Sequence, residues 1–281
     1  MADISAKDVA ALRKVTGAGM MDCKRALEES AGDMGAAKDW LRQKGLAGAA
    51  KREGRDANEG AIEVVVEGST GAVVELNCET DFVAKGDVFR RALDGLTRLV
   101  LAEGDADIAG TSYEGATVDD FVKGLAGTLG EKIELGRVVR YESADGLLDG
   151  YKHVQNERGV VGVLVELGGV SASDAKAQEV AHDIALHIAS AAPRYVSRDD
   201  VPADVVAKER DILEAQTRDE GKPEQALPKI VEGKLNGFFK TVALLEQPFV
   251  KDQKTTIKAL VDGLGDSATV RRFARVKIGE E

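Results

Sequence analysis

The chain has 281 residues, of which 43% are hydrophobic and 31% are charged, a composition typical of a globular protein with two or three domains. Its net charge of -11 argues against broad, non-specific nucleic-acid binding, which depends on neutralising phosphates, although a local basic patch is compatible with that charge. The chain has no apolar run as long as a membrane span, no secretory signal in "MADISAKDVA", and no disulfide or zinc pattern from its two cysteines, so we expect a cytoplasmic protein.

The first 45 residues predict three short helices. Ser5 is a suitable N-cap for the first, and the "TGAG" stretch at residues 16–19 ends it because glycine adopts turn conformations easily. "MMDCKRALEES" forms the second helix, Gly32 ends it, and Asp33 caps the third. So short a segment gives a marginal core, so we expect a small helical module.

Residues 44–60 are rich in glycine, alanine and charge, and they predict a helical or flexible linker. Two interpretations of the basic cluster in this linker stay open. It forms either a solvated surface or a contact with RNA or another partner.

The middle of the chain predicts two units of the same kind. "AIEVVVEG", the turn "STG" and "AVVELNC" alternate as a β-hairpin does, and a helix follows over residues 86–104. "VVRYESADGLLDGYKHV" and "RGVVGVLVELGG" then predict strands around a loop, followed by a helix in "DAKAQEVAHDIALHIASAA". This repeated order suggests an internal duplication.

After Pro193 the chain becomes highly charged, with sparse apolar positions and a break at Gly221 and Pro223. We expect a protruding antiparallel helical hairpin, with helices at about 203–219 and 224–244. A final helix and strand, "TTIKALVDGLG" and "ATVRRFARVKIGE", return to the second unit.

The sequence offers little support for an enzyme. "GAGMMD" lacks the third glycine of a dinucleotide fingerprint and follows a helix rather than a strand. His182 and His187 are five residues apart, which places them about 140° apart on a helix, whereas a two-histidine metal site needs a spacing of four. A Cys–His nucleophile pair stays open until the fold is known, although nothing in the sequence marks Cys23 or Cys78 as activated. We expect no metal site and no cofactor.

One corner of the first unit poses a question. In "NCETDFVAKGD" the strand pattern ends at a charge beside an aromatic ring, Asp81 and Phe82. Either Phe82 turns into the core while Asp81 caps the next helix, or the pair is presented to another molecule.

Three motifs, in this order along the chain, carry a family resemblance: "LRKVTGAGMMDCKRALEESAGD", "NCETDFVAKGD" and "EQPFVKD". Together they resemble bacterial elongation factor Ts, the nucleotide-exchange factor of elongation factor Tu, over nearly the whole chain. The resemblance implies an α+β fold with a small three-helix (UBA-like) module and a duplicated β-hairpin/helix core with antiparallel sheets. It divides the chain into residues 1–55, 56–140 and 141–281, with the hairpin at about 200–244.

The resemblance also implies the site and the partner. Elongation factor Tu would be bound in its GDP-bound and nucleotide-free states, and GDP release would follow from disturbance of its magnesium and phosphate site. The residues implied for this step are Thr80, Asp81, Phe82 and Val83. Arg13, Met20 and Met21 of the helical module and His153 of the second unit would contact the same G domain. For Met20 and Met21 a core role is the alternative, and for His153 a structural role in a loop.

Two other functional classes remain in competition with that interpretation. A ribosome- or RNA-associated adaptor would use the helical module and the basic linker, and its binding would fall steeply with salt. A small-molecule enzyme would need a pocket with perturbed acids or bases, of which the sequence gives no sign. We expect no membrane partner and no stable nucleic-acid binding; self-association stays open.

Overall fold

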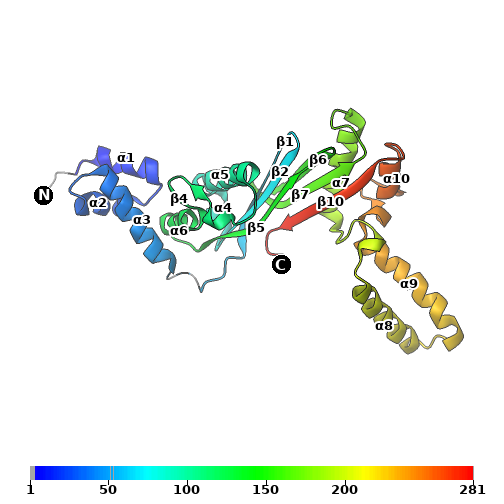
Figure 1. Ribbon diagram of the computed structural model, residues 1–281. Helices are drawn as coiled ribbons and strands as arrows, with labels where there is room; N and C mark the ends of the chain where they lie inside the picture. Colours follow the sequence, from blue (N-terminus) through cyan, green and yellow to red (C-terminus); the bar gives the residue numbers. More distant parts are fainter. Residues whose placement is uncertain (1–3, 51, 53, 281) are drawn as a thin grey trace.

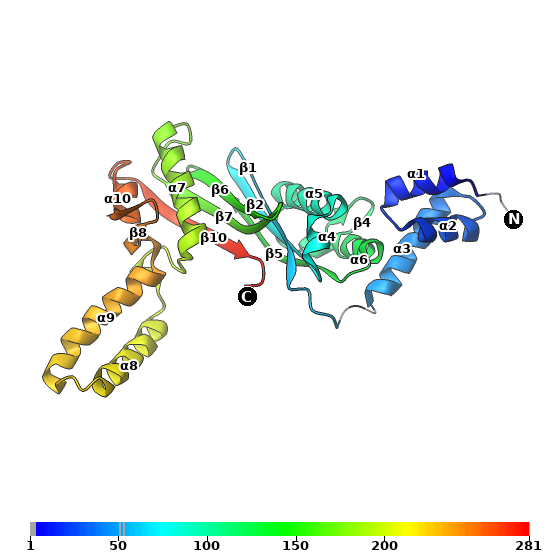
Figure 2. The ribbon, with the colours of Figure 1, turned by 180° about the vertical axis from the view of Figure 1, so that it is seen from behind.

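The computed structural model describes residues 4–50, 52 and 54–280. The molecule is elongated, with a helical module at one end, two units that each contain a sheet, and a helical hairpin projecting near the other end (Figure 1). The view from behind shows the same order, with the module and the hairpin far apart (Figure 2). The mixture of helices with antiparallel sheets confirms the predicted α+β class.

The N-terminal module (residues 4–50) contains three helices: α1 (Ala6–Thr16), α2 (Met20–Glu29) and α3 (Met34–Ala50). The predicted caps are present: Asp8 donates its backbone N–H to Ser5 Oγ, and Ala36 donates to Asp33 Oδ1 at 2.8 Å. Its small core consists of Val9, Leu12, Ala18, Cys23, Ala26, Leu27 and Ala37. The third helix continues seven residues into the segment predicted as a helical or flexible linker.

The first unit is built on a sheet with the order β1-β2-β5, comprising β1 (Glu59–Glu67), β2 (Thr70–Cys78) and β5 (Ile133–Glu142). Its helices are α4 (Asp81–Lys85), α5 (Asp87–Glu103) and α6 (Val118–Leu129). A 3-10 turn and a two-stranded ribbon join α5 to α6: η1 (Ile108–Gly110), β3 (Ser112–Tyr113) and β4 (Ala116–Thr117). The predicted hairpin and the predicted helix over residues 86–104 are confirmed.

One strand was assigned to the wrong unit. β5 was predicted to pair within the second unit, but it pairs with β2, and the expected boundary at residue 140 falls inside it. Arg137 shows why, since its Nε donates to Glu75 Oε2 on β2 at 2.8 Å. Glu75 is buried, and a buried carboxylate needs such a partner.

The second unit has the sheet order β10-β7-β6, comprising β6 (Leu147–Gln155), β7 (Arg158–Gly168) and β10 (Thr269–Lys277). The helix α7 (Ala175–Ala191) packs on β6 and β7, so the hairpin-plus-helix order of the first unit is repeated. The predicted return of the chain is confirmed, because α10 (Ile257–Asp262) leads into β10, which pairs with β7.

The predicted helical hairpin is also present, as α8 (Ala203–Asp219) and α9 (Leu227–Val242). Its buried seam consists of Val201, Leu213, Val231, Leu235, Phe239 and Val242. η3 (Glu224–Ala226) lies in the turn between the two helices. Short elements flank the hairpin: η2 (Arg198–Asp200), η4 (Leu244–Glu246), β8 (Pro248–Phe249) and β9 (Asp252–Thr256). Phe249 and Gln247 of "QPFV" are buried, so this motif supports the second unit.

The two sheets pack on each other through one apolar cluster, whose buried members are Ile62, Val73, Leu164 and Val276. Gly162 makes this close approach possible. A Cβ atom there would lie 2.6 Å from Ile62 Cγ2 and 2.9 Å from Val73 Cγ1. The two units therefore share a continuous interior, which fixes the end of β2 relative to the second sheet.

Candidate functional site

The corner of the first unit, here called the tip (residues 80–83), presents its aromatic ring to solvent. Thr80 caps the short helix α4, and this helix turns Ala84 into the core and Phe82 outward. Phe82 is 82% exposed, although exposure of so large an apolar side chain is unfavourable in water. The alternative in which Phe82 turns into the core is therefore wrong.

Asp81 lies beside the ring and is engaged with Lys85, whose Nζ donates to Asp81 Oδ2 at 2.6 Å. This hydrogen bond lowers the pKa of the Asp81 carboxyl below its ordinary value, so the group stays ionised in mildly acidic solution. The Lys85 ammonium also lies 5.9 Å from the centre of the Phe82 ring. The expectation that Asp81 caps the helix is wrong, because Thr80 provides that cap.

A second exposed apolar group lies on the N-terminal module. Met20 and Met21 open α2 after the turn at residues 17–19 and are 52% and 71% exposed. The alternative that they are core residues is therefore wrong. Arg13 is exposed at the end of α1, and so is Val15, which sequence reasoning missed. Its helical position was ambiguous, since it lies about 120° around the helix from the buried Val9 but only about 60° from the buried Leu12.

The second unit exposes His153 and Val154 at the end of β6. Adjacent strand residues normally face opposite sides, but the register shifts between these two residues, so both reach solvent. Tyr151 orients the histidine, with its hydroxyl 3.2 Å from His153 Nδ1. Val154 was also missed, because a bulge depends on strand pairing and leaves no mark in the local sequence.

The structure brings the tip and the β6–β7 turn to the same region. Arg158, at the start of β7, donates from Nη1 to the Gly60 carbonyl on β1 at 2.6 Å and also contacts Glu59. Its charge contributes to the lowered pKa of Asp81, and Arg90 of α5 reaches the Glu157 carbonyl at 3.5 Å. Met20 and Met21 belong to α2, which lies in the N-terminal module at the end of the molecule (Figure 1).

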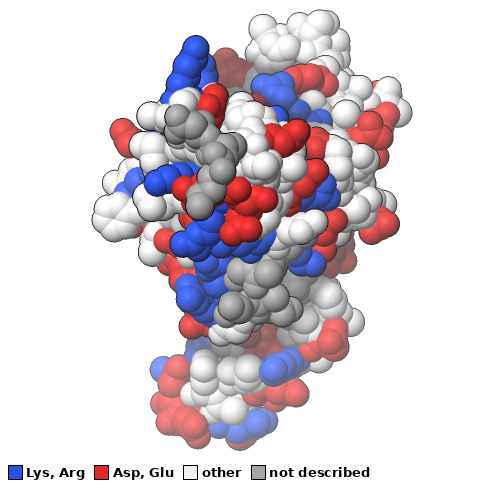
Figure 3. Space-filling model, turned by 90° about the vertical axis from the view of Figure 1, so that its left-hand side faces the viewer, with Lys and Arg blue, Asp and Glu red and all other residues white. Residues whose placement is uncertain are grey.

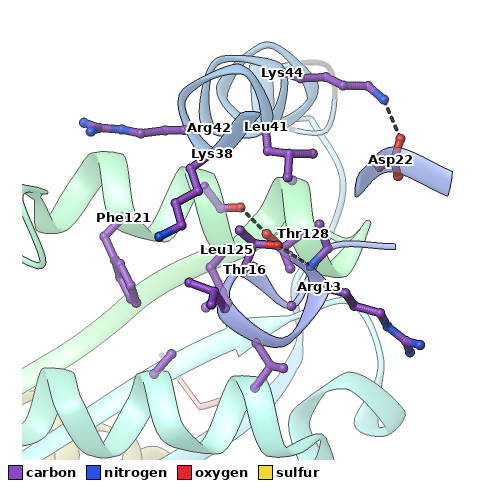
Figure 4. A pocket seen from close by; sticks show the side chains of 18 of the residues that line it. Arg13, Thr16, Asp22, Lys38, Leu41, Arg42, Lys44, Phe121, Leu125 and Thr128 are labelled. Carbon is purple, nitrogen blue, oxygen red and sulfur yellow. Dashed lines mark hydrogen bonds and ion pairs between the residues drawn. The ribbon is translucent and has the colours of Figure 1, made fainter. Parts of the chain in front are cut away.

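Between the N-terminal module and the first unit lies an open cleft of about 1020 Å³. α3 crosses above α6 there, and Leu41 and Leu125 line the cleft from these two helices (Figure 4). Lys44 closes one side by donating to Asp22. The face of the molecule around the N-terminal end carries interspersed acidic and basic side chains (Figure 3), without the uniform positive field that nucleic-acid binding favours.

The described part of the chain contains no cluster of three or more His, Cys, Asp or Glu residues that could hold a metal ion. Both cysteines are buried, and burial is the main cause that raises the pKa of the Cys78 thiol to about 12, which is unlike an activated nucleophile. Within residues 4–50, 52 and 54–280, no helix is long and apolar enough to span a membrane.

These observations describe a protein that presents large apolar side chains to solvent on defined helices and strands: Phe82, Met20, Met21 and Val154 are all more than half exposed. The family model described as elongation factor TS matches residues 79–280. The chain belongs to the elongation factor Ts family.

Relatives named elongation factor Ts match the chain along its whole length. The protein of Thermobifida fusca is 50% identical over 285 residues, covering 100% of both chains. That of Micrococcus luteus is 47% identical over 284 residues, covering 99% of this chain and 100% of its own. That of Mycobacterium ulcerans is 46% identical over 285 residues, again covering 100% of both.

Proposed function

We propose that this chain is the guanine-nucleotide exchange factor of elongation factor Tu. It binds the GDP-bound partner, promotes GDP release by disturbing the magnesium and phosphate site, and so allows GTP to load. It makes and breaks no covalent bond in this cycle. The observation that carries the proposal is Phe82, an 82% exposed ring on a capped helix at the corner of a packed unit.

The tip acts as a wedge against the partner's G domain. Magnesium requires near-ideal octahedral geometry at short distances, so a small displacement of its ligands weakens its hold on the β-phosphate. Burial of the Phe82 ring in the complex contributes about 1.5–3 kcal/mol. Asp81 adds hydrogen bonds to the displaced arrangement with the carboxylate oxygen that Lys85 leaves free, and Thr80 and Val83 hold the wedge in place.

The other exposed residues hold the same partner. Met20 and Met21 suit a protein surface because their flexible thioethers adapt to it, and Arg13 lies at the end of the neighbouring helix. His153 of the second unit contacts the G domain beside the tip. The helical hairpin reaches the partner's other domains, since it projects away from the two sheets (Figure 2).

Linkage makes the effects of the factor and of the nucleotide on each other's binding reciprocal. An exchange factor must bind the nucleotide-free partner more tightly than the nucleotide-bound one, and incoming nucleotide must then weaken the hold of the factor by the same amount. The factor therefore selects neither GDP nor GTP. The cellular GTP supply and the capture of the GTP form by aminoacyl-tRNA decide the outcome.

The experiment is stopped-flow release of fluorescent GDP from elongation factor Tu. We expect the intact chain to accelerate release strongly, and Phe82→Ala to reduce the accelerated rate roughly 10- to 100-fold, because the buried ring supplies about 1.5–3 kcal/mol. The free chain should keep its stability, since Phe82 has little contact with its own core.

Lys258→Ala is the control, because it truncates a long, exposed side chain on α10, away from the tip and from the other proposed contact residues. It should leave the release rate at saturation nearly unchanged. Equal acceleration by Phe82→Ala and the intact chain would refute the wedge. No acceleration by the intact chain would refute the proposed function.

A further inference from the structure

The base of the tip is held by two consecutive residues from a distant loop. Glu131 and Lys132 lie between the end of α6 and the start of β5, and Glu131 is 51 residues after Thr80. Thr80 donates its backbone N–H to Glu131 Oε2 at 3.0 Å and its hydroxyl to Glu131 Oε1 at 2.6 Å. Both oxygens of one carboxylate are thus used on one residue, which fixes position and orientation together.

The contact is reciprocal. Glu79, one residue before Thr80, accepts the backbone N–H of Lys132 at 2.6 Å. This hydrogen bond is the main cause that lowers the pKa of the Glu79 carboxyl, so the group is ionised at neutral pH. The end of β2 and the start of β5 are therefore joined by side chains from both sides, just where their strand pairing ends at Cys78 and Ile133.

The remaining polar groups of Thr80 are satisfied as well. Its hydroxyl oxygen accepts the Val83 N–H at 3.4 Å, which caps α4. Its carbonyl accepts the Cys78 S–H at 3.1 Å and the Ala84 N–H at 3.3 Å. Thr80 is thus fully bonded, whereas Phe82, two residues later, projects into solvent.

We propose that Glu131 is a positioning residue for nucleotide exchange: it fixes Thr80, and through Thr80 the start of α4 and the direction in which Phe82 projects. This inference rests on the proposed function. A wedge can displace a partner's helices only if it does not yield itself, and a tip already ordered in the free chain avoids an ordering cost in the complex. Glu131 acts through Thr80 and not by touching the partner.

The first test measures GDP release from elongation factor Tu as a function of factor concentration. For Glu131→Ala we expect the release rate at saturation to fall about tenfold, because a loosened tip transmits less displacement, and the half-saturating concentration to change less than threefold. Glu131→Gln keeps the shape and one acceptor oxygen, so an intermediate rate is expected. Unchanged rates at saturation in both variants would overturn the proposal.

The control is Glu134→Ala, which removes a carboxylate on β5 whose side chain is 49% exposed and paired with Lys132. It changes the local charge as much as Glu131→Ala does but leaves Thr80 bonded. A loss of rate as large as that of Glu131→Ala would show that charge rather than position matters, and would overturn the proposal.

A double-mutant cycle separates positioning from direct contact. If Glu131 acts through the tip, Glu131→Ala in a chain that already carries Phe82→Ala should lower the rate less than twofold further. If Glu131 touches the partner itself, the two losses will multiply, and the proposal is wrong.

Hydrogen exchange in the free chain gives a readout that needs no partner. The amides of residues 80–84 should exchange at least tenfold faster in Glu131→Ala, and detectably faster in Glu131→Gln, while those of β7 keep their protection. Unchanged protection of the tip in both variants would overturn the proposal. This result stands whether or not the intact chain accelerates GDP release, so a failure of the proposed function is distinguished from a failure of this inference.

Discussion

The two histidines of α7 differ in their exposure to solvent. His182 is exposed, with Nδ1 3.0 Å from Asp149 Oδ2. His187 is buried, with Nε2 2.8 Å from Gln247 Oε1 and Nδ1 accepting the Val250 N–H at 3.3 Å. The His187 ring is therefore neutral, with its proton on Nε2, because Gln247 Oε1 is an acceptor and Nδ1 itself accepts a hydrogen bond. Burial is the main cause that lowers the pKa of His187 below its ordinary value.

This difference predicts a loss of stability in mild acid. Below about pH 6.5 the unfolded chain takes up a proton on His187 while the folded chain does not. The contribution of His187 to the free energy of unfolding is therefore fully present above that pH and is lost progressively as the pH falls towards the lowered folded pKa. Urea unfolding between pH 7 and pH 5 measures this slope.

We expect His187→Gln to be less stable at pH 7 but to have a shallower slope. His182→Gln is the control, and it should keep the acid-induced loss due to His187. An equal slope in His187→Gln and the wild-type chain would contradict the assignment of a neutral, buried ring.

At the scale of elements, the N-terminal module is attached by a close helix crossing. α3 and α6 meet at Gly45 and Gly127, where a Cβ on Gly127 would lie 2.2 Å from the Gly45 Cα. Beside this crossing, Arg42 of α3 forms an ion pair with Asp120 of α6, with 3.8 Å between Nη2 and Oδ2. Backbones approach this closely only where side chains are absent.

Two substitutions one turn apart test the crossing. Gly124→Ala meets no atom within 4 Å and should stabilise α6 by up to about 1 kcal/mol, whereas Gly127→Ala must push α3 away. The distance between spin labels at Lys24 on α2 and Arg98 on α5 should lengthen and broaden only in Gly127→Ala. Identical distances in both variants would show that the crossing tolerates a side chain.

The same crossing explains what sequence reasoning overlooked. α6 was not predicted, because Gly124 and Gly127 lower its helix propensity, and the reason for Gly127 is a contact with a helix about 80 residues away. α4 was missed because five residues give no periodic pattern. α6 does carry a helical apolar spacing, in Val118, Val122 and Leu125, so its own periodicity offered a signal that sequence reasoning did not use.

Some residues of the candidate site could be found from the sequence, and others could not. The residues of the tip and of the N-terminal module came from family motifs, and the structure shows that Phe82, Met20 and Met21 are exposed. Their roles in exchange stay predictions. Glu131 had no local signal, since its hydrogen bonds to Thr80 exist only after β5 has joined the first sheet.

At the scale of the whole molecule, the two units behave as one body because their sheets share a core. Ile62, Val73 and Leu164 come from both sheets and are almost fully buried. Gly150, on β6, also allows this contact, because a Cβ there would lie 2.8 Å from Val64 Cγ1. Displacement of the tip by a partner is therefore resisted by the whole double-sheet core.

Gly162→Ala tests this coupling between the units. The added methyl group would lie 2.6 Å from Ile62 Cγ2, so the sheets must shift, and we expect a cost of about 1–3 kcal/mol in the free energy of unfolding. GDP release at saturation should slow as well, because the tip loses its rigid support. Calorimetry measures the loss of stability, and stopped-flow fluorescence measures the rate of GDP release.

Gly233→Ala, on α9, is the control, since nothing lies within 4 Å of the added atom, and it should be neutral or slightly stabilising. If Gly162→Ala were as stable as the wild-type chain, the space between the two sheets would accommodate a methyl group. The shared core would then not explain the rigidity of the tip.

The exposed ring of Phe82 also affects how copies of this chain behave among themselves. A surface that displays Phe82 and Met21 invites contact with any apolar neighbour, including another copy, yet each copy carries a net charge of -11. Mutual repulsion keeps copies apart in dilute salt, whereas about 0.1 M salt confines it to roughly 10 Å. Ionic strength thus decides how close two copies come before their exposed apolar side chains can touch.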